Sequence, residues 1–206
     1  MMNRPMSARA VVAMDTTARD GIYDEEDRVT GTSNAKKVLA ALQDLVPSAN
    51  QHAEPLYAGW ARENAVISLR PALVIIHRSS FHHSYNAVFK FATTIPPARR
   101  AEDPNWWFLY SEISDDKLIT LLGIIGKGVP DTKFLIYSRG TDTNWLRGEY
   151  RAQWVKKVEG RFPELDGRVS TMVIPNFYQG SFKDPETITL LRSNVTYILE
   201  LPKRAK

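Results

Sequence analysis

Short apolar runs of strand length alternate along this chain with longer stretches in which apolar residues recur at helical spacing. Strands are predicted over 8–14, 52–58, 72–76, 133–137 and 169–174. Helices are predicted over 33–45, 59–69, 114–126, 143–161 and 184–199. The two kinds of segment follow one another in turn, and this alternation is typical of consecutive βαβ units.

The strands at 73–76 and 134–137 show no polar alternation, which indicates that both of their faces are buried. Parallel neighbours need crossover connections, which helices supply. The sequence therefore predicts an α/β fold: a doubly wound, mostly parallel five-stranded sheet with helices on both faces, in the strand order 2-1-3-4-5. This is a three-layer sandwich.

A chain of 206 residues with 43% hydrophobic content is long enough for one core, so a single domain over 1–206 is predicted. Two connections, 16–32 and 84–111, are too long to be plain turns. Both begin at the carboxyl ends of strands, where ligands bind in open α/β sheets, and this favours a lid or a partner surface. The second carries Trp106 and Trp107, which form either a partner interface or the packing of the sheet edge.

Charge and composition argue against several classes of protein and of functional site. The net charge is +4, but Lys and Arg are scattered along the chain, so nucleic-acid binding is not favoured. There is no cysteine, which removes disulfides, thiolate metal sites and a cysteine nucleophile. The apolar run at 10–14 is too short for a secretory signal, and no segment has the length to span a bilayer. We therefore expect a soluble, cytoplasmic protein without a membrane partner.

Polar residues replace hydrocarbon where several strands end. Asp15, His77 and Ser138 follow the first, third and fourth strands, which are neighbours in the predicted order, so their side chains should meet at one edge. A wider set of polar residues should surround them as ligand-binding residues: Thr16, Thr17, Arg78, Ser79, Ser80, Arg139 and Asn176.

Two kinds of chemistry suit this row. In nucleophilic hydrolysis Asp15 would orient His77, which would take the proton of Ser138, although the G-x-S-x-G elbow is absent. In anion binding Arg78 and Arg139 would converge on a phosphate or carboxylate. The alternative for these arginines is pairing with Asp15, Asp142 or acids of the first long connection.

The sequence identifies neither a metal nor a cofactor. His77, His82 and His83 lie close together but lack the spacing of a known zinc motif. Acids within 20–27 could supply oxygen ligands to magnesium, but not in the pattern of a calcium loop. No G-x-G-x-x-G or Walker A motif is present, so a dinucleotide or ATP site of the usual kind is not favoured.

The run Ser-Phe-Lys-Asp-Pro-Glu-Thr-Ile at 181–188, which follows an apolar strand, resembles the end of a response-regulator receiver domain. Ser138 and Asp15 also stand where receivers carry a hydroxyl residue and acids. The resemblance implies a flavodoxin- or receiver-like fold. At the end of the third strand, however, a receiver has a phosphorylatable aspartate and this chain has His77, while Lys183 comes later than the usual lysine. The implication is a degenerate, pseudo-receiver-like module that does not use ordinary aspartyl phosphorylation.

Two functions follow as hypotheses. The favoured one is a regulatory or interaction domain that recognises an anionic small molecule, bearing phosphate or carboxylate, or a protein partner at the carboxyl edge of its sheet. The alternative is a hydrolase of an ester or phosphoester with a Ser/His/Asp or metal-assisted site.

Overall fold

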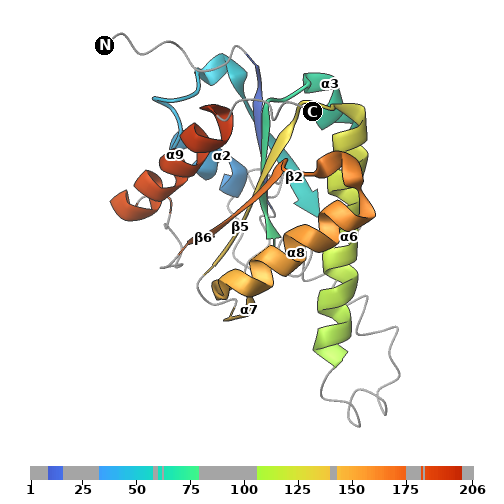
Figure 1. Ribbon diagram of the computed structural model, residues 1–206. Coiled ribbons are helices and arrows are strands. Elements are labelled where there is room, and N and C mark those ends of the chain that lie inside the picture. The colour runs from blue at the N-terminus through green and yellow to red at the C-terminus, as the bar shows by residue number, and fades with distance from the viewer. Residues whose placement is uncertain are drawn as a thin grey trace.

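A parallel sheet forms the centre of the structure (Figure 1). The computed structural model describes residues 9–15, 33–57, 60–61, 63–78, 106–139, 143–174, 182 and 184–200. Five strands run parallel to their neighbours: β1 (Val11–Asp15), β2 (Gln51–Tyr57), β4 (Leu73–His77), β5 (Lys133–Arg139) and β6 (Val169–Ile174). Their order is β2-β1-β4-β5-β6, so the predicted fold class and strand order are confirmed.

One edge of the sheet carries an additional strand that the sequence analysis did not predict. β3 (Trp60–Ala61) runs antiparallel to β2. A helix was predicted over 59–69, but α3 (Glu63–Leu69) begins only after β3. A strand of two residues is too short to show alternation of polar and apolar positions, so periodicity cannot reveal it.

Helices cover both faces of the sheet (Figure 1). α2 (Ser33–Ala40) and α9 (Pro185–Glu200) pack on one face. The other face is covered by α3, α6 (Trp106–Gly128), α7 (Thr143–Leu146), α8 (Gly148–Arg161) and the short 3₁₀ helix η3 (Pro163–Leu165). A further 3₁₀ turn, η1 (Ser48–Asn50), leads into β2.

The sheet divides the interior into two apolar cores. Leu73 and Ile75 point into the core shared with α2 and α9, whereas Val74 and Ile76 point into the core shared with α6 and α8. All four side chains are fully buried. This two-sided burial is the reason that β4 reads in the sequence as uninterrupted hydrocarbon.

Three other predicted helices also have different bounds in the structure. α6 begins at Trp106 and not at Ser114, so the last part of the predicted connection 84–111 is helical and Asp115 lies inside the helix. The helix predicted over 143–161 is divided, because Arg147 adopts an extended conformation (φ −78°, ψ 120°) between α7 and α8. The helix predicted over 33–45 ends at Ala40 and is followed by turns.

α9 begins with a side-chain cap. The Oδ2 atom of Asp184 accepts hydrogen bonds from the backbone N–H and from the hydroxyl of Thr187, each at 2.9 Å. These two bonds favour the ionised carboxylate and lower the pKa of Asp184. The cap fixes the start of the last helix where the sequence predicted it.

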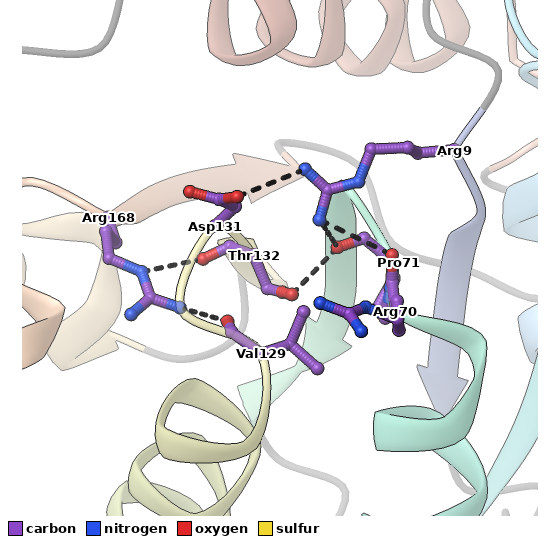
Figure 2. A network of polar contacts seen from close by, with 7 residues as sticks. All are labelled: Arg9, Arg70, Pro71, Val129, Asp131, Thr132 and Arg168. Atoms are coloured by element: carbon purple, nitrogen blue, oxygen red, sulfur yellow. Dashed lines mark hydrogen bonds and ion pairs between the residues drawn. The ribbon is translucent and has the colours of Figure 1, made fainter.

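The amino-terminal edge of the sheet is held by side chains that bond to backbone carbonyls (Figure 2). Arg168, just before β6, donates to the carbonyls of Thr132 (2.8 Å) and Val129 (2.9 Å). The hydroxyl of Thr132, just before β5, donates to the carbonyl of Pro71 (2.7 Å), which also accepts a longer bond from Arg9 (3.4 Å). The starts of β1, β4, β5 and β6 are therefore tied together.

Candidate functional site

The carboxyl edge of the sheet brings Asp15 and His77 together. Met14 and Ile76 are partners in the parallel register of β1 and β4, and the next residue on each strand is Asp15 and His77. The Nδ1 atom of His77 lies 3.1 Å from Oδ1 of Asp15. A carboxylate only accepts, so Nδ1 carries the proton of this hydrogen bond. The imidazole is held in one tautomer and one orientation.

This pair lies at the topological switch point of the sheet. The chain leaves β1 and returns as β2 on one side of it, and it later returns as β4 on the other side. In open α/β sheets, ligands bind outside the carboxyl ends of the two strands where the direction of winding reverses. Asp15 and His77 are the last residues of those two strands.

Tyr137 completes a cluster that the sequence analysis did not predict. Its hydroxyl donates to Oδ2 of Asp15 at 2.5 Å, and its ring stacks on His77 with centroids 4.9 Å apart and planes 17° from parallel. Burial, followed by the charge of Asp15 and the hydrogen bond to it, raises the pKa of Tyr137 well above its ordinary value. The carboxylate of Asp15 is thus bonded to His77 through one oxygen and to Tyr137 through the other.

The cluster is buried within the core that α2 and α9 cover. His77 has 0% of its surface exposed and Asp15 has 5%. Phe182 packs edge-on against the ring of Tyr137, with centroids 5.7 Å apart. Hydrogen bonds in such surroundings are stronger than in water, because less solvent screens them.

Ser138 lies on the opposite face of the sheet from His77. Tyr137 is the register partner of His77, and Ser138 follows it on β5. Successive strand residues point to opposite faces, so Ser138 is on the side of Ile136 and the α6 core. Tyr137 places its hydroxyl on the same side as His77. The polar residues at the strand ends, which the sequence predicts to form one row, therefore lie in two groups, one on each face of the sheet.

Arg78 belongs to the second group. Its Nη2 atom lies 2.8 Å from Oδ2 of Asp115 on α6 and donates to the hydroxyl of Tyr150 at 3.1 Å. The guanidinium also sits 4.9 Å from the ring centre of Trp145. Arg78 and Asp115 are 5% and 7% exposed. The sequence named Asp15, Asp142 and loop acids as alternative partners, but the counter-ion is Asp115, whose position inside α6 was not predicted.

The remaining candidate residues lie outside the described part of the chain: Thr16, Thr17, Ser79, Ser80, Asn176, the side chains of Arg139, Trp106 and Trp107, His82, His83, Asp142 and the acids of 20–27. The described residues contain no group of three or more His, Cys, Asp or Glu that could hold a metal ion. In the same part of the chain, no helix has both the length and the apolar character needed to cross a bilayer.

Comparison with known proteins assigns no family. No family model matches the chain, and no curated protein matches it significantly. Among solved structures, the chain is similar to a carbohydrate esterase whose active site is described as displaying divergent catalytic and non-catalytic binding functions. The TM-score is 0.49 with 14% sequence identity, over 91% of this chain and 68% of the esterase chain.

Proposed function

We propose that the protein is a hydrolase of esters or phosphoesters, with His77 as general base and Asp15 as the carboxylate that orients it. The observation that carries this proposal is the 3.1 Å contact between Nδ1 of His77 and Oδ1 of Asp15 at the switch point of the sheet. A histidine held in this way keeps Nε2 as its proton acceptor. Because His77 is 0% exposed, the proposed reaction also needs a conformation in which water and substrate reach Nε2.

The proposed reaction uses water as its nucleophile. Ser138 does not take that role, because it lies across the sheet from the imidazole. Nε2 of His77 takes a proton from the water, and the oxygen of the water forms a bond to the carbonyl carbon or phosphorus of the substrate. The bond from that atom to the leaving oxygen breaks, and the imidazolium returns its proton to the leaving alcohol. Asp15 stabilises the positive imidazolium that exists between the two proton transfers.

The test compares wild type with His77→Asn on the p-nitrophenyl esters of acetate, butyrate and phosphate, with and without Mg²⁺. The amide of asparagine retains a donor toward Asp15, so the fold should persist while the base is lost. The expected loss of turnover is about 10² to 10⁴-fold, the range for a general base. His52→Asn is the matched control, because His52 lies on β2 at the register position of Val12 and away from the pair. A wild-type protein that hydrolyses none of these substrates contradicts the proposal.

The second candidate is a regulatory or interaction domain that recognises an anionic small molecule or a protein partner at the same edge. The observation that favours it is the burial of His77 and Asp15, because a buried polar cluster can hold a binding surface in one conformation without turnover. The resemblance to receiver domains also belongs to this candidate. If the protein has this function, inorganic phosphate or citrate should raise its melting temperature, and Arg139→Gln should remove this effect.

A further inference from the structure

Tyr137 contacts both members of the Asp15 and His77 pair. Its hydroxyl bonds to the carboxylate oxygen that His77 does not use, and its ring lies against the imidazole. The three residues come from three adjacent strands, β1, β4 and β5. A single side chain thus constrains the acid and the base together.

We propose that Tyr137 is a positioning residue that fixes the orientation of Asp15 and His77 and limits how strongly Asp15 attracts the proton on His77. This rests on the proposed function, since it assigns Tyr137 to the same site. The physical basis is that the single negative charge of a carboxylate is distributed over its two oxygens. An O–H donor on one oxygen withdraws negative charge from the other, so the imidazolium gains less from Asp15 than it would from an unbonded carboxylate.

Asp15 is a charged neighbour of the imidazole. The buried side chains that α2 and α9 contribute to this core are uncharged, Thr187 included. The other buried charges in the described part of the chain, Arg78 and Asp115, lie on the opposite face of the sheet. Phe182, which packs on Tyr137, carries no charge.

The test is an NMR titration of the imidazole of His77 in the full chain, which needs no substrate. The chain has four histidines, and the signal of His77 is assigned by its loss in His77→Asn. Tyr137→Phe removes the hydroxyl and keeps the ring. The titration midpoint of His77 should then rise, because Asp15 keeps more of its negative charge for the imidazolium. If the protein is a hydrolase, the acid limb of its kcat/KM profile should move upward by the same amount.

A second variant separates the proposed role from simple packing. In an Asp15→Asn background the carboxylate is absent, so adding Tyr137→Phe should leave the midpoint unchanged. A midpoint that stays constant in Tyr137→Phe, or that moves equally in both backgrounds, overturns the proposal. If Tyr137→Phe does not fold, replacement of tyrosine by 3-fluorotyrosine serves instead, because its more acidic hydroxyl is a stronger donor and should lower the midpoint of His77.

The proposed function and this inference can fail separately. A shifted midpoint in a protein that hydrolyses nothing contradicts the hydrolase and retains the role of Tyr137. Turnover that depends on His77, with no change of the His77 titration midpoint in Tyr137→Phe, retains the hydrolase and contradicts the role of Tyr137.

Discussion

The two edges of the sheet use polar side chains in different ways. At the amino edge, Arg168 and Thr132 donate to backbone carbonyls (Figure 2). At the carboxyl edge, His77 and Tyr137 both hydrogen-bond to the carboxylate of Asp15. Backbone carbonyls do not titrate, so the first arrangement contributes stability at any ordinary pH. The second consists of groups that can gain or lose protons, which is the property that acid–base chemistry needs.

The largest expected effect concerns the buried ion pair of Arg78 and Asp115 at the carboxyl edge. Arg78→Met should lower the free energy of unfolding by about 3 to 5 kcal/mol, because it leaves a buried carboxylate without its cation. The double variant with Asp115→Leu removes both charges and should recover most of the loss. Urea unfolding measures both. A double variant as unstable as Arg78→Met would show that the packing of the guanidinium matters more than its charge.

A smaller effect is expected at the amino edge. Arg168→Ala removes donors to the carbonyls of Thr132, Val129, Gly126 and Glu164, and should cost about 2 to 3 kcal/mol. Arg9→Ala is the matched control, since its contacts are longer and its side chain is 41% exposed, and it should cost less than about 1 kcal/mol. Neither change should move the NMR titration of His77. A shift in either variant would contradict the separation of the two edges.

The smallest effect is the alkaline dependence that Tyr137 gives the carboxyl edge. Its pKa is raised in the folded protein, so its neutral form adds stability that is complete below the ordinary value of 10.0 and is lost as the pH rises above it. Each added pH unit should remove at most about 1.4 kcal/mol. In urea unfolding between pH 8 and 11, the stability of wild type should therefore fall more steeply than that of Tyr137→Phe. Equal slopes would indicate that the phenol ionises as readily in the folded state.

The sequence predicts the sheet well because each central strand is buried on both faces and so appears as unbroken hydrocarbon. It predicts the meeting of Asp15 and His77 for the same reason, since adjacent parallel strands end at one edge. It does not assign the polar residues to the two faces, because that depends on register, which a shift of one residue reverses. Tyr137 was therefore included among the apolar residues of β5, and Ser138 was placed beside His77.

The position of Asp115 shows a second limit of prediction from the sequence. Helical spacing identified the apolar face of α6, but the start of the helix at Trp106 could not be read from it. A helix that began at residue 114 would hold Asp115 in its first turn. In the structure it lies inside the helix and meets Arg78, a contact 37 residues away in the chain that periodicity cannot reveal.

The hydrogen bond between Tyr137 and Asp15 also bears on how the chain folds. It joins residues that are 122 positions apart, and the bond between His77 and Asp15 spans 62. Contacts this distant in sequence close late and slowly, because the entropy of a long loop must be lost first. β1 emerges before β5 during synthesis, so the carboxylate of Asp15 can bond to Tyr137 only when β5 docks. A fragment that ends before β5 lacks this bond, so the bond can form only when the centre of the sheet is complete.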